Sequence, residues 1–159
     1  VVKINPSILE CLMGENLIPV ISTIGTDSKG QAYNINSDAV ASALAGSLKA
    51  ERLLYLTDVE GLLEDVSDPA SKISKIGISS LSDLINEGTV KSGMIPKAQA
   101  CIDAIKKGVA SAHMVDGRIP HVLLLELFTD AGIGTMVLPE DMLDLSKSQD
   151  QGKVDDELV

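Results

Sequence analysis

The chain has 159 residues and a formal charge of −10, from 13 lysine and arginine residues against 23 aspartate and glutamate residues. This length suits one domain with a substantial core, and an apolar content of 45% excludes wholesale disorder. The acidic balance argues against a nucleic-acid-binding protein, because phosphate neutralisation needs clustered basic residues, and no apolar run approaches the length of a membrane span.

Strand and helix patterns alternate along the chain, without an internal repeat. In the N-terminal third we expect a strand over residues 1–4, a helix over 8–17, a buried strand over 17–21, a hairpin turn over 25–30, an extended segment over 31–35 and a helix over 37–48. Further on we expect a buried strand over 53–56, a surface loop around 64–68, helices over 81–87 and 96–107, a strand over 111–115, a helix over 122–128 and a strand over 135–138.

This alternation predicts an α/β fold, a three-layer sandwich whose sheet is mainly parallel. Residues 1–139 form the predicted domain. Because the chain opens inside a predicted strand, we expect part of the fold to precede Val1. Residues 140–159 carry seven acidic residues against two lysines and form a predicted, partly disordered tail.

Three polar residues, Asn34, Asn36 and Asp38, lie two positions apart where an extended segment meets a helix. A helix start needs one polar cap, whereas Asn36, Ser37 and Asp38 crowd a single turn. One interpretation is redundant capping. The other is a polar cluster at the carboxyl edge of the sheet, where open α/β folds bind ligands. In that cluster the amides bind a carboxylate or phosphate, and Asp38 orients a cation or a lysine.

Lys97 follows Pro96 in the first turn of a predicted helix. The helix macrodipole disfavours a cation at this end, by a few tenths of a kcal/mol to about 1 kcal/mol. A bound anion reverses that sign, because helix N-termini and lysines together form phosphate sites. The alternative is a solvated lysine that tolerates the position.

Residues 57–61 (TDVEG) directly follow a predicted strand and so place polar groups at its carboxyl end. Neither a P-loop nor a dinucleotide-binding fingerprint occurs in the chain. The histidines have no cysteine or acidic residue at ligand spacing, so we expect no zinc site. Cys11 and Cys101 provide no disulfide framework, which favours a cytoplasmic protein.

Four segments together resemble the acetylglutamate kinases of the amino-acid kinase family. They are residues 18–25 (IPVISTIG), 30–38 (GQAYNINSD), 56–63 (LTDVEGLL) and 93–97 (GMIPK), in the order and at the spacing of the family. The resemblance covers residues 1–139 and only the C-terminal, nucleotide-binding part of the family fold. The family's opening lysine–glycine–glycine strand, its second glycine-rich loop and its substrate-binding arginine are absent, so we expect the N-terminal part of the fold to be missing. Ser37 stands where the family usually has alanine.

The resemblance implies a reaction of arginine biosynthesis, in which the γ-phosphoryl group of ATP moves to the γ-carboxylate of N-acetyl-L-glutamate, with Mg²⁺ bridging the ATP phosphates. It implies that Lys97 stabilises the transferring group and that Asp38 organises the catalytic lysines. Asn34, with Asn36 close by, matches the residue that binds the α-carboxylate of the substrate. The implied nucleotide-binding residues form two segments, Asp58, Val59, Glu60, Gly61, Leu62 and Leu63, then Thr89, Val90 and Lys91.

Residues 108–135 further resemble the arginine-inhibited, hexameric branch of the family. His113, Glu126 and Gly132 match effector positions of that branch, around residues 116–121 (DGRIPH) and 123–126 (LLLE). This implies allosteric inhibition by L-arginine and a homo-oligomer. Chemically, Glu126 can meet a guanidinium as a bidentate acceptor. The alternative is a core histidine and a solvated helix glutamate.

Two classes of function therefore stay open. The first is an acetylglutamate kinase, of which this chain is a part that is inactive by itself, or a related kinase that acts on another acidic amino acid. The second is a non-catalytic regulatory module that binds a nucleotide or arginine.

Overall fold

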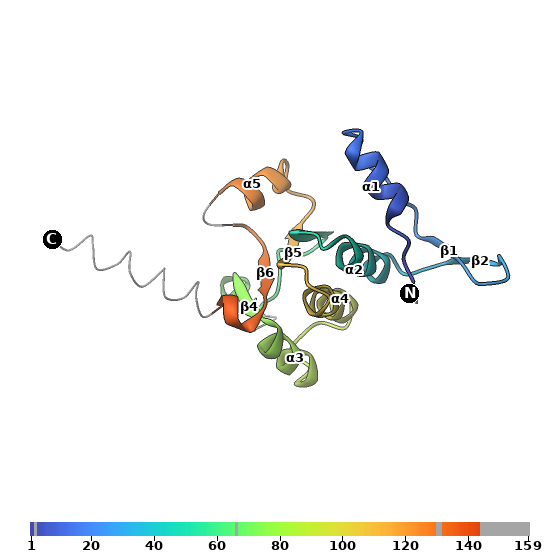
Figure 1. Cartoon of the computed structure of the whole chain (residues 1–159). Coiled ribbons are helices and arrows are strands. Elements are labelled where there is room, and N and C mark those ends of the chain that lie inside the picture. Colours follow the sequence, from blue (N-terminus) through green and yellow to red (C-terminus); the bar gives the residue numbers. More distant parts are fainter. Residues whose placement is uncertain (2, 66, 130–131, 144–159) are drawn as a thin grey trace.

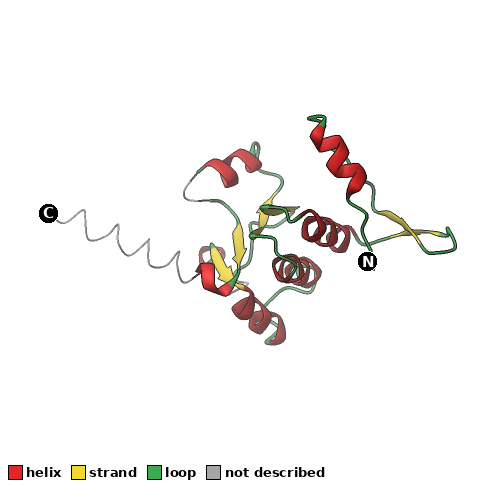
Figure 2. Ribbon diagram, in the orientation of Figure 1, coloured by secondary structure: helices red, strands yellow, loops and turns green. Residues whose placement is uncertain are grey.

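The computed structural model describes residues 1, 3–65, 67–129 and 132–143. Its centre is a four-stranded sheet in the order β3-β5-β6-β4. The strands are Arg52–Thr57 (β3), Lys75–Gly77 (β4), Ser111–Asp116 (β5) and Thr135–Leu138 (β6). β3 pairs with β5 and β4 with β6 in parallel, while β5 and β6 run antiparallel. The predicted α/β fold with a mainly parallel sheet is therefore confirmed (Figures 1 and 2).

Helices cover the two faces of this sheet unequally (Figure 1). Ser37–Leu48 (α2), Ile78–Asn86 (α3) and Ile95–Lys106 (α4) lie on one face, and Val122–Phe128 (α5) lies on the other. Successive side chains of a strand point to opposite faces, and β5 shows this directly. Its Ala112 and Met114 belong to the core beneath α4, whereas His113 between them contacts α5.

The N-terminal part of the chain stands apart from the sheet (Figure 1). Ser7–Gly14 (α1) precedes an antiparallel hairpin of Ile24–Thr26 (β1) and Ala32–Asn34 (β2). The Asp27 carboxylate closes the turn, because its Oδ1 accepts hydrogen bonds from the backbone N–H groups of Lys29 and Gln31 at 2.8 and 3.0 Å. The predicted helix, turn and extended segment are confirmed, although α1 ends at Gly14 rather than at residue 17.

Two predicted strands are wrong. Residues 1, 3 and 4 and residues 17–21 have no strand structure, and in the second segment the Ile18 and Val20 side chains are 91% and 97% exposed. An aliphatic run forms a strand only where another strand can pair with it and a second layer can cover it. The described part of the chain supplies neither at these positions. The strand expected over 53–56 exists as β3, but it is an edge of the sheet and leaves Leu56 53% exposed instead of buried.

The other predicted elements are present. The bounds predicted for α2, α5 and β6 are those observed, and α4 begins at Ile95 with Pro96 in its first turn. β4 and the 3₁₀ turn Pro69–Ser71 (η1) were not predicted, because both are too short to show a period. Within the described residues no helix is both long and apolar enough to cross a membrane. Residues 144–159, most of the predicted tail, lie outside the described residues.

Candidate active site

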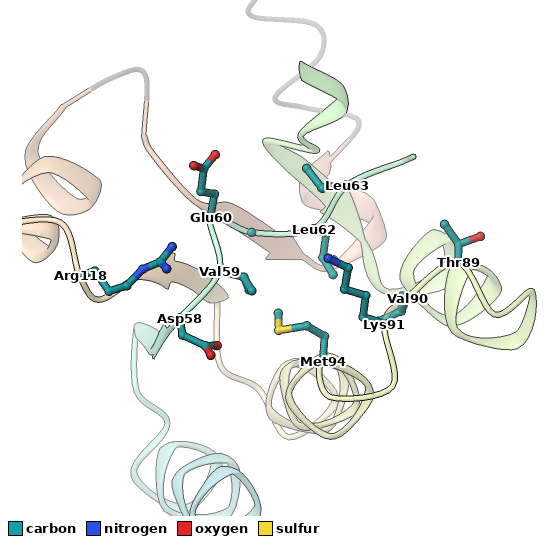
Figure 3. Close-up of a pocket in the computed structure, with 11 residues that line it drawn as sticks. Asp58, Val59, Glu60, Leu62, Leu63, Thr89, Val90, Lys91, Met94 and Arg118 are labelled. Carbon is teal, nitrogen blue, oxygen red and sulfur yellow. The ribbon is translucent and has the colours of Figure 1, made fainter. Parts of the chain in front are cut away.

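The carboxyl ends of β3 and β5 meet at one edge of the sheet, because these two strands are parallel. A cavity of about 280 Å³ lies at this edge (Figure 3). Its lining includes every residue of the two segments that the family resemblance assigns to nucleotide binding: Asp58, Val59, Glu60, Gly61, Leu62, Leu63, Thr89, Val90 and Lys91. Segments separated by some 30 positions in the sequence are thus brought to one place.

Two threonines hold the loop that follows β3. Thr57 Oγ1 accepts a hydrogen bond from the backbone N–H of Val59 at 3.1 Å and donates one to the backbone oxygen of Val59 at 2.7 Å. From β6, Thr135 Oγ1 accepts a hydrogen bond from the backbone N–H of Leu62 at 2.9 Å. Gly61 has a φ of +137°, and a Cβ at this residue would lie 2.6 Å from Thr135 Oγ1. The close approach of the loop to β6 therefore requires glycine.

The cavity combines an apolar floor with a charged rim (Figure 3). Met94 and Arg118 complete the lining, and the sequence analysis assigned neither to the nucleotide. Met94 belongs to the 93–97 motif, so its position there was the available signal. Arg118 belongs to the 116–121 motif, which the resemblance connected with an effector instead.

Lys97 and Asp38 form an ion pair across the first turns of α4 and α2. Lys97 Nζ lies 3.1 and 3.0 Å from Asp38 Oδ1 and Oδ2. The side chains are only 26% and 12% exposed, so the interpretation of Lys97 as a solvated lysine is wrong. The macrodipole of α4 disfavours the ammonium group, and the Asp38 carboxylate offsets that cost. The Tyr55 hydroxyl donates to the backbone oxygen of Asp38 at 2.9 Å and so ties α2 to β3.

Capping explains Asn36 but not Asp38. Asn36 is the N-cap of α2, and its Oδ1 accepts a hydrogen bond from the backbone N–H of Ala39 at 3.1 Å. Asn34 ends β2 with an exposed side chain, and within the described residues no hydrogen bond links it to the Lys97–Asp38 pair. The structure thus joins two of the four residues expected at the site of chemistry and leaves Asn34 and Asn36 facing solvent.

The three residues matched to effector positions lie together on the α5 face of the sheet. His113 Nδ1 lies 2.7 Å from Glu126 Oε1. An ionised carboxylate can only accept, so Nδ1 carries a proton and donates it to this hydrogen bond. Glu126 Oε2 accepts hydrogen bonds from the backbone N–H groups of Ile133 and Gly134 at 2.7 and 3.1 Å. Gly132, with a φ of +55°, packs so that a Cβ would lie 3.4 Å from Glu126 Oε2.

This cluster is buried: the side chains of His113 and Glu126 are each 2% exposed. Burial by itself would raise the pKa of Glu126, but the hydrogen bonds from His113, Ile133 and Gly134 together lower the pKa below its ordinary value. The interpretation of His113 as a core histidine is therefore correct, and that of Glu126 as a solvated glutamate is wrong. The arginine-binding role of the cluster stays a prediction.

No group of three or more histidine, cysteine, aspartate or glutamate side chains in the described part of the chain could hold a metal ion.

Comparison with known proteins agrees with this arrangement. The sequence profile of the amino acid kinase family matches residues 1–116. The chain is 50% identical over 137 residues to the acetylglutamate kinase of Moorella thermoacetica, covering 86% of this chain and 46% of that protein. It is 52% identical over 136 residues to the acetylglutamate kinase of Nostoc sp., again covering 86% and 46%.

Among solved structures, the N-acetylglutamate synthase of Neisseria gonorrhoeae, complexed with coenzyme A and L-arginine, superposes with a TM-score of 0.77 at 26% identity, over 87% of this chain and 31% of that chain. The chain spans about half the length of the curated relatives it matches. Since the family profile covers most of the sequence and the fold agrees, the chain belongs to the amino-acid kinase family.

Proposed function

We propose that this chain is the nucleotide-binding part of an acetylglutamate kinase, which transfers the γ-phosphoryl group of ATP to the γ-carboxylate of N-acetyl-L-glutamate in the arginine biosynthesis of the cytoplasm. The observation that carries the proposal is one cavity lined by all nine residues that the resemblance assigns to nucleotide binding. The first turns of α2 and α4 carry the ion pair of Asp38 and Lys97. Identity of about 50% to acetylglutamate kinases supports the choice of substrate over another acidic amino acid.

Phosphoryl transfer between two anions needs charge neutralisation and in-line positioning more than covalent help. In this proposal the loop after β3 and residues 89–91 hold the nucleotide. Lys97, at the positive end of α4, neutralises charge on the transferring group, and Asp38 fixes the direction of its ammonium. Mg²⁺, when bound, would supply further neutralisation of the phosphate charge.

The acceptor side of the reaction is only partly represented. Asn34 and Asn36 are the proposed contacts for the α-carboxylate of the substrate, yet both side chains are exposed and neither is held toward Lys97. The rate gain from bringing two reactants together depends on holding them in a near-attack geometry, and most of this gain is lost when the acceptor is held loosely. We therefore expect these 159 residues alone to have no measurable kinase activity. From the family resemblance we also propose that the complete protein acts as a homo-oligomer.

L-Arginine is the proposed inhibitor, and His113, Glu126 and Gly132 are the proposed effector site. Support comes from their adjacency on the α5 face and from the synthase that was solved with L-arginine. Oε1 of Glu126 has one hydrogen-bond partner and Oε2 has two, so a bidentate guanidinium would have to replace at least one of the backbone N–H groups of Ile133 and Gly134. Millimolar L-arginine should inhibit the complete protein, and an enzyme indifferent to it would contradict the proposal.

The decisive experiment is a kinetic assay of Lys97→Ala in the complete protein. Loss of a preorganised charge at the transferring group should lower kcat at least about 10²-fold, with a smaller change in the KM for ATP. Lys106→Ala is the matched control, because Lys106 lies exposed in the last turn of the same helix. Near-normal kcat in Lys97→Ala would remove the lysine from the mechanism. Nucleotide binding without transfer to N-acetyl-L-glutamate in the wild-type protein would favour the non-catalytic module.

A further inference from the structure

Arg118 is fixed in an unusual way at the rim of the cavity. Asp116, the last residue of β5, accepts hydrogen bonds from Arg118 Nε at 2.8 Å and from Arg118 Nη2 at 2.7 Å. The backbone N–H of Arg118 also donates to Asp116 Oδ1, at 2.9 Å. The Asp116 side chain is 7% exposed and that of Arg118 is 65% exposed. A buried carboxylate thus holds one edge of the guanidinium, through Nε and Nη2, and orients this planar group, which lines the cavity.

The charge of Arg118 is already balanced by its surroundings. Asp58 and Glu60 flank the guanidinium on the cavity side (Figure 3). The hydrogen bonds that Arg118 donates to Asp116 raise the pKa of Arg118, and the charges of Asp58 and Glu60 raise it further. In turn, the hydrogen bonds from Arg118 lower the pKa of Asp116 to about 2, so both groups are ionised at neutral pH. Three carboxylates around one guanidinium leave this wall negative, and a negative wall repels a phosphate group.

The opposite parts of the cavity have a different character. Lys91 enters from the side facing Arg118, and Val59, Leu62 and Met94 lie between the two cations (Figure 3). An apolar floor beside a flat, weakly hydrated guanidinium suits an aromatic ring, which Arg recognises through its face. The flanking carboxylates suit hydrogen-bond donors, such as sugar hydroxyls or an exocyclic amine. In the proposed function the phosphates meet a different cation, Lys97 in the first turn of α4.

We propose that the Asp116–Arg118 pair forms the nucleobase wall of the nucleotide site, with the guanidinium face packed against the base and its charge directed to Asp116. The proposal deepens the proposed function and rests on the nucleotide site described there. Arg118 is a positioning and specificity residue for the base and the ribose. It makes no contact with the phosphates, and it is not part of the His113–Glu126 cluster, although the 116–121 motif connects β5 to α5.

The test is equilibrium binding of adenosine, ADP and ATP to the complete protein, in the wild type and in Arg118→Ala. Stacking on a guanidinium contributes the same amount whatever the phosphate tail, so the variant should weaken all three by one common factor, roughly 3- to 30-fold. Arg118→Lys keeps the charge but not the plane, and it should bind all three as weakly as Arg118→Ala. The control is Arg52→Ala, because Arg52 opens β3 at the end remote from the cavity and should leave binding unchanged.

Each alternative gives a different pattern. A loss that grows from adenosine to ATP, or recovery in Arg118→Lys, would mean that Arg118 binds phosphate through its charge and would overturn the proposal. Unchanged binding of all three compounds would overturn it as well. Arg118 is exposed, so its variants should fold, and equal circular dichroism spectra check this. A wild-type protein that binds none of the three compounds would refute this proposal and the proposed function together. If the common-factor loss occurs without phosphoryl transfer in the wild type, only the proposed function fails.

Discussion

Replacing Glu126 by alanine should destabilise the fold more than replacing any exposed acidic residue by alanine. Its carboxylate accepts three hydrogen bonds, from His113 Nδ1 at 2.7 Å and from the N–H groups of Ile133 and Gly134 at 2.7 and 3.1 Å. These bonds join α5 to β5 and to the segment before β6. Deleting the carboxylate leaves three donors without an acceptor, in a site where Glu126 is only 2% exposed.

The magnitude follows from the cost of breaking a buried pair by removing one partner, about 3–5 kcal/mol. That is a large part of the roughly 5–15 kcal/mol by which a domain is stable. Glu126→Gln keeps the size of the side chain and one carbonyl acceptor, so it should cost less, about 1–3 kcal/mol for the donors it cannot satisfy. The expected order of stability is wild type, then Glu126→Gln, then Glu126→Ala.

Urea unfolding followed by circular dichroism at 222 nm measures this difference, and it suits a chain without tryptophan. At one fixed protein concentration, the urea midpoint should fall at an unchanged m-value. Glu10→Ala is the control, because Glu10 is exposed on α1 and its loss should change stability by no more than about 0.5 kcal/mol. A Glu126→Ala midpoint equal to that of Glu10→Ala would refute the reasoning.

The same variants give a pH test. Because the pKa of Glu126 is lowered in the folded state, its ionisation contributes stability above the ordinary value of 4.5, and that contribution is lost as the pH falls through the lowered pKa. Glu126→Gln has no such titration. The difference in the free energy of unfolding between wild type and Glu126→Gln should therefore be largest near pH 6 and should decrease below pH 4.5. A gap that widens on acidification would contradict the assigned direction of the shift.

Three further predictions concern other parts of the chain. Gly61→Ala should lower the free energy of unfolding by about 1–3 kcal/mol and weaken nucleotide binding, because φ is +137° and a Cβ would lie 2.6 Å from Thr135 Oγ1. Gly14→Ala in α1 is the control: its Cβ would meet no atom within 4 Å, so this variant should be neutral or stabilising. Thiol titration at pH 8 should find one reactive cysteine in the native chain and two in denaturant, because Cys11 is exposed while burial raises the pKa of Cys101 to about 12. The isolated chain should self-associate through the exposed apolar residues of its N-terminal part, Ile18 and Val20 above all, as light scattering would show, and a monodisperse monomer would contradict this.

Much of the candidate site could be predicted because it depends on strand ends. Residues 57–61 follow a predicted strand, so the local pattern and the family resemblance pointed to the same loop, whereas residues 89–91 were assigned by the resemblance alone. Parallel pairing of β3 and β5 then brings their carboxyl ends to one edge. The position of residues 58–63 at that edge could be predicted because it depends on the strand that ends just before them.

The predictions that proved wrong concern residues whose burial depends on contacts between segments far apart in the sequence. The aliphatic run over 17–21 resembles a buried strand by composition, but burial needs a partner that local sequence does not specify. On α5 the expected pattern is inverted. Val122 and Glu126 face the sheet, while Leu123, Leu124 and Phe128 are exposed. Nothing within that helix indicates that its one acidic residue is buried, because the reason is His113 on a strand behind it.

The His113–Glu126 cluster and the nucleotide cavity share one short piece of backbone. Glu126 Oε2 accepts from Gly134, and the next residue, Thr135, accepts from the N–H of Leu62 in the cavity loop. A ligand that displaced Gly134 from Glu126 would therefore act one residue away from the group that holds the loop. This connection has the form that coupling between two sites requires, a contiguous set of contacts with a replaceable partner at one end. The close packing of the loop, β6 and β5 accounts for the glycines at 61 and 134, because a side chain at either position would separate these segments.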